Sequence, residues 1–205
     1  YSDTYPHTPA ECAESPDVIV DFSHASATDA ILDYAVANGT PIVIGTTGHT
    51  PAQLSHIERA AEHVAVFHSG NMSVGIAVLV ELAKQAARAF PDADIEIIEV
   101  HHKHKADAPS GTALMLANAI AQVRPDSRNV LGRSGQGKRT PEEIGIHAIR
   151  MGNIVGEHEV IIGTQSQTIT LKHEAHDRAL FAEGGLAAAA PDGEAVEERP
   201  PVVRG

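Results

Sequence analysis

The chain has 205 residues, of which 42% are hydrophobic, enough to bury one good core or two modest ones. Its formal net charge of -12 excludes a surface built for nucleic acid, which needs lysine and arginine in surplus. The single cysteine, Cys12, excludes an internal disulfide framework and favours a cytoplasmic location. No apolar run approaches the roughly 20 residues that span a bilayer, so we expect no membrane partner.

Strands and helices alternate in the first part of the chain. Short β-branched runs that end in small or polar residues predict buried strands, at 17–23, 40–48 and 64–73. Two helices are predicted between them: one ends at Gly39, and the other begins with the pair Thr50 and Pro51. This order with short links is typical of right-handed βαβ units in a parallel sheet.

The pattern changes near residue 72, which predicts a domain boundary between 1–72 and 73–185. Within 73–185, helices are predicted at 73–90 and 110–123, with a strand at 94–102 between them. The stretch 124–143 has weak structure signals and is expected to be a loop.

Three later runs, IGIHAIRM, IVGEHEVIIGT and QTITLKHEA, alternate with turns and predict a meander of antiparallel strands. The fold class is therefore α/β: a parallel-sheet domain followed by an α+β domain with a mixed or antiparallel sheet. The Ala-, Glu- and Pro-rich stretch 186–205 starts as a short helix and is expected to continue as a disordered tail.

Cationic and titratable side chains gather in the stretch EVHHKHKADAPSGTA, from Glu99 to Ala113. Ser110 is a natural N-cap for the following helix, and Gly111 lets another group approach the backbone. The free amides and the dipole at a helix start favour an anion, most simply a carboxylate. Simple capping is the plain alternative, but the positive charge just upstream favours an anion site.

Three interpretations of the cluster stay open on the residues alone. It can be a solvated charge run with no further role. His101, His102 and His104, with Asp107 nearby, can ligate a metal such as zinc, although the adjacent ammonium groups repel a dication. The third interpretation is acid–base catalysis on an anionic substrate, since histidine titrates near neutrality and a lysine among cations releases its proton more readily.

Three further histidines lie in predicted strands. His173 and His176 lack the H-E-x-x-H spacing of a zinc protease helix, and His158 stands in the run GEHEV. We expect packing or hydrogen-bonding roles for them, and no metal.

The pattern E-x-H-H-x-x-K-x-D-x-P-S-G-T-A resembles the signature of the dihydrodipicolinate reductase (4-hydroxy-tetrahydrodipicolinate reductase) family. This sequence meets every fixed position, and the likeness extends over about residues 17–181 through DFSHASAT, GTTG, NMSVG, IEIIE and RMGNIVGEHEVII. The resemblance implies a cytoplasmic oxidoreductase of lysine and diaminopimelate biosynthesis. Such an enzyme transfers hydride from NADH or NADPH to a cyclic dicarboxylate, and the family's second domain builds a homotetramer.

The resemblance also implies roles for individual residues of the cluster. His101 matches the family's catalytic histidine, Lys105 its proton donor and His102 a substrate-binding histidine. One substrate carboxylate would be held by the helix start, at Ser110, Gly111 and Thr112. Arg133 and Arg178 are further candidates for the second carboxylate.

Two segments match the family's cofactor contacts. The loop beside the nicotinamide is matched by Gly45, Thr46 and Thr47. The interdomain segment is matched by Ser69, Gly70, Asn71 and Met72.

One departure from the family pattern bears on the cofactor. Family members open with a strand and a Gly-rich turn that seats the pyrophosphate, and no G-x-x-G-x-x-G occurs in this sequence. The resemblance therefore implies a truncated, Rossmann-like, partial dinucleotide-binding domain at 1–72. The alternative to an active reductase is a non-catalytic oligomeric fragment that binds a dicarboxylate but no dinucleotide.

Overall fold

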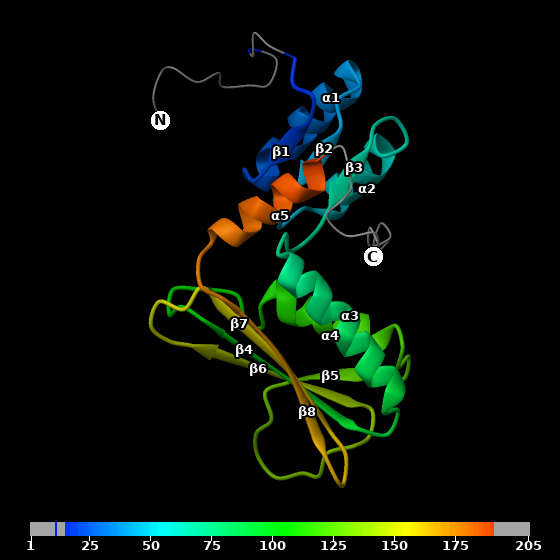
Figure 1. Ribbon diagram of the computed structural model, residues 1–205, viewed down its shortest axis with the longest axis vertical. Helices are drawn as coiled ribbons and strands as arrows, with labels where there is room; N and C mark the ends of the chain where they lie inside the picture. The colour runs from blue at the N-terminus through cyan, green and yellow to red at the C-terminus, as the bar shows by residue number, and fades with distance from the viewer. Residues whose placement is uncertain (1–10, 12–14, 191–205) are drawn as a thin grey trace. The chain divides into compact units, whose positions relative to one another are not determined.

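The computed structural model describes residue 11 and residues 15–190 of the chain (Figure 1). Its contacts divide the chain into two compact units. The first contains the described residues up to Gly70 together with those from Phe181 onward, and the second spans Asn71–Leu180. Cys12 and residues 191–205 lie outside the described part of the chain. No helix within that part is both long and apolar enough to cross a lipid bilayer.

The first unit is built on a parallel sheet with the strand order β1-β2-β3. Its strands are β1 (Ile19–Asp21), β2 (Ile42–Ile44) and β3 (Val66–His68). After a 3-10 turn at Ala25–Ala27, α1 (Thr28–Asn38) joins the first two strands, and α2 (Pro51–Ala60) joins the last two. This confirms the parallel sheet predicted from the strand–helix alternation.

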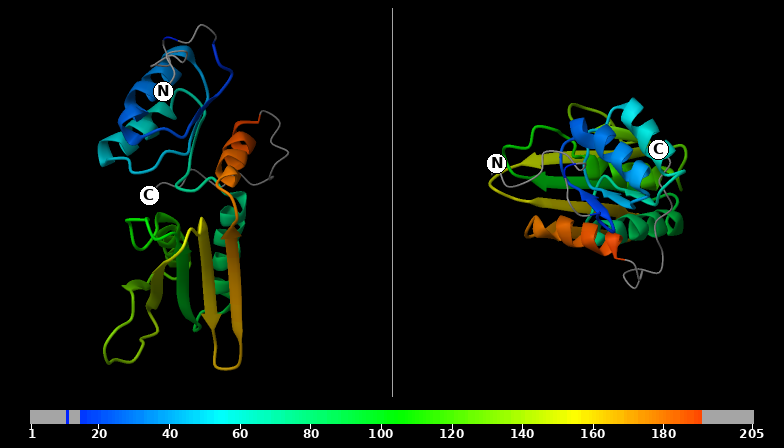
Figure 2. Two further views of the ribbon diagram at one scale, coloured as in Figure 1. Left: turned by 90° about the vertical axis from the view of Figure 1, so that its left-hand side faces the viewer. Right: turned by 90° about the horizontal axis from the view of Figure 1, so that it is seen from above.

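Both faces of this sheet are covered (Figure 2). Helices α1 and α2 pack on one face through Leu32 and Ile57, which share a buried cluster with Ile42 and Ile44 of β2. Leu32 is only 1% exposed, whereas Ala30 on the same helix is exposed. The helix signals themselves were correct, because Gly39 adopts φ 66° and Thr50 forms a capping box with Gln53.

Helix α5 (Ala179–Ala189) packs on the other face, beside β1. Gly184 and Gly185 are buried there. A Cβ at Gly185 would lie 2.8 Å from the ring of Phe22 and 3.5 Å from Val20, so the glycine permits a close approach. The helix extends past the start of the stretch predicted as a tail.

The second unit is a five-stranded mixed sheet with the order β5-β6-β4-β7-β8. Its strands are β4 (Asp94–His101), β5 (Arg128–Leu131), β6 (Glu143–Arg150), β7 (Gly156–Gly163) and β8 (Thr168–Ala175). β6 runs parallel to both β4 and β5, whereas β7 pairs antiparallel with β4 and β8.

Two predictions about this sheet were wrong. β6 does not pair with β7, because β4 lies between them, so the last three strands do not form a continuous meander. The stretch predicted as a loop contains β5. Alternation along a strand reveals that it has a buried face, but not which strand it will pair with.

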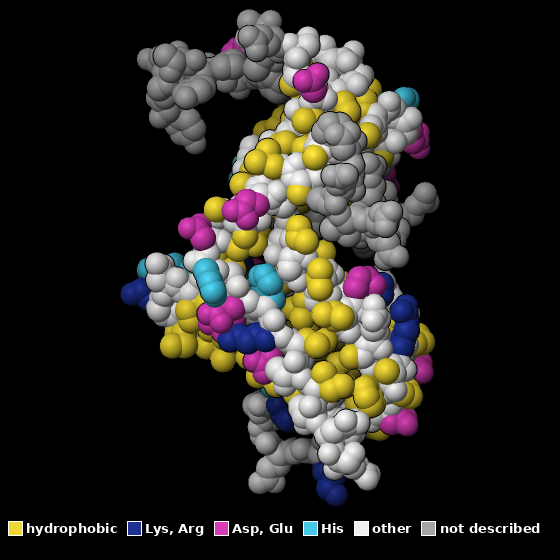
Figure 3. Space-filling model, viewed as in Figure 1, with side chains coloured by type: hydrophobic (Ala, Val, Ile, Leu, Met, Phe, Trp, Pro, Cys, Tyr) yellow, Lys and Arg dark blue, Asp and Glu magenta, His cyan; other side chains and the backbone are white. Residues whose placement is uncertain are grey.

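Helices α3 (Val74–Ala89) and α4 (Gly111–Ala121) lie on one face of this sheet (Figures 1 and 2). Alternate strand residues face them and close a core with the helices, formed by Ile76, Leu79, Leu116, Ile120, Ile95, Ile97, Ile144, Ile146, Val160 and Ile162. Hydrophobic side chains also gather on the outer surface of α3, where Val74, Val78 and Leu82 are exposed (Figure 3).

Candidate active site

The helix-facing side of β4 changes from apolar to polar along the strand. Ile95 and Ile97 belong to the core, and the next two residues on the same face are Glu99 and His101. Glu99 is fully buried and His101 is 8% exposed. A buried carboxylate beside a buried imidazole is costly to desolvate, so its hydrogen-bond partners decide whether it can exist.

Four hydrogen bonds surround the Glu99 carboxylate. Oε2 accepts one from Nδ1 of His101 at 2.6 Å, and Oε1 accepts one from the backbone N–H of Ser110 at 2.9 Å. The guanidinium of Arg150 donates to both oxygens, at 2.7 Å each. Burial on its own raises the pKa of Glu99, but these donors together outweigh it, and the pKa lies below its ordinary value. The group is therefore a carboxylate anion.

His101 uses only one of its ring nitrogens inside the protein. Nδ1 contacts Glu99, whereas Nε2 makes no hydrogen bond to any described residue. Burial lowers the pKa of His101; the Glu99 carboxylate opposes this, and the Lys105 and Arg150 cations add to it. The pKa consequently lies below its ordinary value, which gives a neutral ring near neutrality with Nε2 able to accept a proton.

The start of α4 is linked to this carboxylate through the backbone N–H of Ser110. Ser110 caps the helix through its Oγ, which accepts from the N–H of Ala113 at 3.2 Å. The first amides of a helix have no partner within it, so those of Gly111 and Thr112 remain available to an anion. Apart from Gly111, its chain neighbours and the backbone of α4, no atom of the described residues lies within 4 Å of the position of a Cβ at Gly111. Thr112 Oγ1 accepts from Asn71 Nδ2 at 2.9 Å.

A second row of histidines runs across the sheet from Glu99. His158 on β7 pairs in register with Glu99, and His173 on β8 pairs with His158. Each contacts the capping serine of a helix at 3.2 Å: Nε2 of His158 lies beside Ser110, and Nε2 of His173 lies beside Ser73 at the start of α3. Burial, reinforced by His101, lowers the pKa of His158 to about 4. These hydrogen-bonded, strand-borne positions agree with the packing role expected for His158.

Lys105 and His102 lie on the turn that follows β4. Lys105 Nζ forms an ion pair with Asp107 at 2.8 Å, so its immediate partner is an anion rather than the cations that the sequence suggested. His102 is half-buried, and its ring lies 6.4 Å from that of His104. In the part of the chain that the structure describes, no three histidine, cysteine or carboxylate side chains are grouped so as to hold a metal ion.

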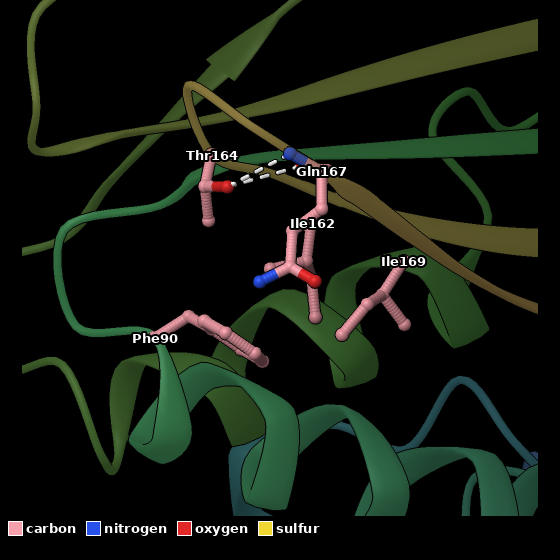
Figure 4. Close-up of a pocket in the computed structure, with 5 residues that line it drawn as sticks. All are labelled: Phe90, Ile162, Thr164, Gln167 and Ile169. Atoms are coloured by element: carbon pink, nitrogen blue, oxygen red, sulfur yellow. Dashed lines mark hydrogen bonds between the residues drawn. The ribbon is translucent and has the colours of Figure 1, made fainter.

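Two other features lie away from this cluster. Arg133 pairs with Glu143 at the beginning of β6, roughly 20 Å along the strand from Arg150. The structure therefore separates Arg133 from the predicted carboxylate site. Figure 4 shows a hollow lined by Phe90, Ile162, Thr164, Gln167 and Ile169. It also lies at the far end of the sheet from His101, because Ile162 pairs in register with Ile95 near the start of β4.

The predicted cofactor residues of the first unit follow the carboxyl ends of its strands. Gly45, Thr46 and Thr47 follow β2, and the N–H of Ser69 after β3 donates to the carbonyl of Ile44. Among the described residues, Thr46 Oγ1 and Asp21 Oδ2 are buried without a hydrogen-bond partner. Unpartnered buried oxygens at this edge of a parallel sheet fit a polar ligand such as a dinucleotide.

The remaining predicted cofactor residues lie beyond this edge. Gly70 is exposed and is the last residue of the first unit before the chain enters the second. Asn71 and Met72 belong to the second unit, where Met72 is 6% exposed. Arg178, the other candidate for the second carboxylate, is exposed.

The fold defines a class of two-unit α/β protein: a small Rossmann-like parallel-sheet unit, and a mixed-sheet unit in which a buried histidine lies near the start of a helix. Comparisons with known families agree with this class. The family described as "Dihydrodipicolinate reductase, N-terminus" matches residues 4–72, and "Dihydrodipicolinate reductase, C-terminus" matches residues 75–202. The chain belongs to the dihydrodipicolinate reductase family.

Individual relatives support the same assignment. The 4-hydroxy-tetrahydrodipicolinate reductase of Alkaliphilus metalliredigens is 48% identical over 85% of this chain and 74% of its own length. The dipicolinate-bound dihydrodipicolinate reductase of Paenisporosarcina sp. TG-14 has a TM-score of 0.67 at 32% identity, over 82% of this chain and 66% of that chain. GenD2 from gentamicin A biosynthesis, in complex with NAD, shares the fold alone, with a TM-score of 0.50 at 13% identity over 90% of this chain and 71% of that chain.

These relatives extend beyond the present chain, which spans 66% to 74% of the length of those in its own family. Sequence reasoning missed Arg150 and the contacts of His158. The alternation of β7 contains a signal for His158, because Val160 and Ile162 on the same face are core residues. No local signal identifies Arg150, whose partner Glu99 lies 51 residues earlier in the chain.

Proposed function

We propose that this protein reduces 4-hydroxy-tetrahydrodipicolinate to tetrahydrodipicolinate with NADH or NADPH, in the lysine and diaminopimelate route of the cytoplasm. Over the reaction the substrate loses water and gains a hydride and a proton. The main support for this proposal is that the residues of the family signature lie close together. Glu99 hydrogen-bonds to His101 and to the N–H of Ser110 at the start of α4, and the charge of Lys105 acts on His101.

One substrate carboxylate binds at the start of α4 in this proposal. The amides of Gly111 and Thr112 and the helix dipole supply the attraction. Thr112 Oγ1 already accepts a hydrogen bond from Asn71, so its own proton is directed to the ligand. Ser110 acts mainly as the cap, because it is 2% exposed and contacts Ala113 and His158.

Lys105 and His101 are the proposed groups for transferring the proton that the substrate ring takes up. When bound, the reduced nicotinamide supplies a hydride, and the ring then requires one proton. Lys105 is the proposed donor, and Asp107 holds its ammonium group beside the site. His101, with Nε2 directed away from Glu99, is the second proton carrier, and its neighbour His102 contacts the substrate.

Replacing Lys105 tests the proposed role directly. We expect Lys105→Ala to lower turnover by roughly 10²–10⁴-fold, the usual loss for an acid–base group, without lowering the unfolding temperature. Oxidation of the reduced nicotinamide, followed by absorbance, measures this. Lys103→Ala, two positions away and exposed, is the matched control and should remain active. Equal turnover in the two variants would remove Lys105 from the mechanism.

The cofactor proposal is tested by binding rather than turnover. Asp21 Oδ2 and Thr46 Oγ1 provide polar groups that fit a dinucleotide at the first unit. Titration of the chain with NADH and with NADPH, followed by nicotinamide fluorescence, should saturate for at least one of them. If neither saturates, the alternative of a non-catalytic dicarboxylate-binding protein replaces the reductase.

A homotetramer is the proposed assembly. The face of the second sheet opposite α3 and α4 carries Ile98, Val100, Ile149 and Ile161 among charged side chains. Apolar residues on a sheet face without covering helices support association with further copies. Sedimentation equilibrium should give four times the chain mass, whereas a monomer would contradict this part of the proposal.

A further inference from the structure

We propose that Glu99 is a positioning residue for the reaction: it fixes the tautomer and the orientation of His101, and it ties that ring to the first turn of α4. This inference rests on the proposed function, because it takes His101 as the residue that contacts the substrate. Glu99 itself acts only through others. Its role therefore differs from the direct catalytic and binding roles that the family resemblance implies for His101, His102 and Lys105.

The hydrogen bonds of Glu99 leave it no capacity for a ligand. A carboxylate has about four acceptor sites, two on each oxygen. Oε2 accepts from His101 and Arg150, and Oε1 accepts from Ser110 and Arg150. The side chain is also fully buried. Glu99 therefore neither binds substrate nor exchanges protons with solvent.

The same contacts join three elements that must stay in register for catalysis. His101 ends β4, Ser110 caps α4, and Arg150 ends β6, where it pairs in register with His101. Arg150 also donates to the carbonyl of Asp107, which pairs with Lys105. One buried carboxylate thus sets the position of the histidine relative to the anion-receiving amides.

The orientation of the ring is specific. A hydrogen bond from Nδ1–H to a carboxylate places the proton of the neutral ring on Nδ1 and leaves the lone pair on Nε2. Gly156 on β7 stands beside that nitrogen, and a Cβ there would lie 3.0 Å from Nε2. The absence of a side chain at this point keeps Nε2 uncovered.

Charges of both signs surround His101, which makes the inference testable. Glu99 faces it from the same strand, Arg150 from β6, Lys105 from the following turn, and the ring of His158 from β7 at 5.1 Å. Removing the anion and removing the cation should therefore move the titration of His101 in opposite directions. A residue with only a packing role would not produce opposite shifts.

The experiment compares Glu99→Gln, Arg150→Gln and the double variant in the full chain, with ¹⁵N-labelled histidine. Long-range ¹⁵N–¹H spectra report the tautomer and the titration of His101 without any need for turnover. We expect Glu99→Gln to lower the pKa of His101 and to mix its tautomers, and Arg150→Gln to raise the pKa. In active protein the acidic limb of kcat/KM should move in the same directions, with kcat falling roughly 10–100-fold in Glu99→Gln.

The double variant guards against a failure to fold, because it removes both charges and leaves neither a buried anion nor an unpaired cation. It should retain the mixed tautomers of Glu99→Gln. Glu157→Gln, a carboxylate on β7 paired with Lys172, is the matched control and should leave His101 unchanged. If His101 keeps its wild-type tautomer in the double variant, or if its pKa does not move in opposite directions in the two single variants, the inference is wrong. If the spectra behave as expected but no variant or wild-type protein reduces the substrate, the proposed function fails instead.

Discussion

At the scale of single residues, the hydrogen bonds formed within the protein determine which atoms of the site can still bind a ligand. Glu99 has all of its acceptor sites filled, Ser110 is used as a cap, and His101 has one nitrogen in use and one without a partner among the described residues. The proposed ligand contacts use groups that remain available: Nε2 of His101, the ammonium of Lys105, the ring of His102, the hydroxyl proton of Thr112 and the first amides of α4. Only these few groups retain the hydrogen-bonding or proton-transfer capacity that a reaction would need.

Gly156 provides a test at this scale. Its backbone permits alanine, but the added methyl group would lie 3.0 Å from Nε2 of His101 and would cover or displace the ring. We expect Gly156→Ala to lower kcat/KM at least roughly 10-fold, since small displacements of a reacting group are costly. Steady-state kinetics measure this. Gly163→Ala, at the other end of the same strand, adds a methyl group with no described atom within 4 Å beyond its chain neighbours and should have wild-type kinetics. An equal loss in both variants would contradict the argument.

At the scale of secondary-structure elements, α5 closely approaches the ring of Phe22, the residue that follows β1. The ring of Phe22 lies between Gly185 on α5 and Gly45 after β2, and a Cβ at either glycine would come within 3 Å of it. The ring cannot move away from one glycine without approaching the other. The two glycines thus let the helix cover the edge strand of the first sheet.

We expect the effect of Gly185→Ala to change sign with residue 22. Alanine is favoured over glycine within a helix by about 1 kcal/mol, so without a clash the change would stabilise α5. In the wild-type background it should instead lower the free energy of unfolding, because the methyl group meets the Phe22 ring. In a Phe22→Ala background it should raise it. Denaturant unfolding of the four proteins measures both effects, and stabilisation in both backgrounds would refute the close contact.

The elements of the first unit were largely predictable, because capping and glycine signals such as Thr50 and Gly39 act locally. The helix start at Ser110 was predictable for the same reason. The pairing of β6 with β4 could not be predicted. The two strands lie far apart in the sequence, and no local signal shows that they become neighbours in the sheet. Arg150 was missed with it. The candidate site could therefore be predicted for its contiguous stretch and not for the part supplied by sheet pairing.

At the scale of the whole molecule, buried histidines make stability depend on pH. The pKa of His158 is lowered from 6.5 to about 4 in the folded chain. As the pH falls through this range, the unfolded chain takes up a proton that the folded chain refuses, so folded stability declines. The loss from this residue alone reaches about 3 kcal/mol at pH 4.

His158→Gln tests this dependence. The substitution removes the titrating group, so the free energy of unfolding should fall less steeply between pH 6.5 and pH 4 than in the wild type. Urea unfolding at several pH values within this window measures the difference. His176→Gln, an exposed residue of the same type, should retain the wild-type slope. Parallel slopes for His158→Gln and the wild type would show that the buried ring does not titrate as proposed.

The separation of Glu99 and Arg150 by 51 residues also determines when the site can assemble while the chain is being synthesised. A chain still emerging from the ribosome exposes the acid of β4 long before its counter-ion has been made. Until β6 arrives, this acid has no cation to accompany it into the interior, and α4 cannot close over the strand at low cost. Chains that end before β6 should accordingly lack the ordered Glu99–His101 arrangement and be cleaved more readily by proteases than the full chain.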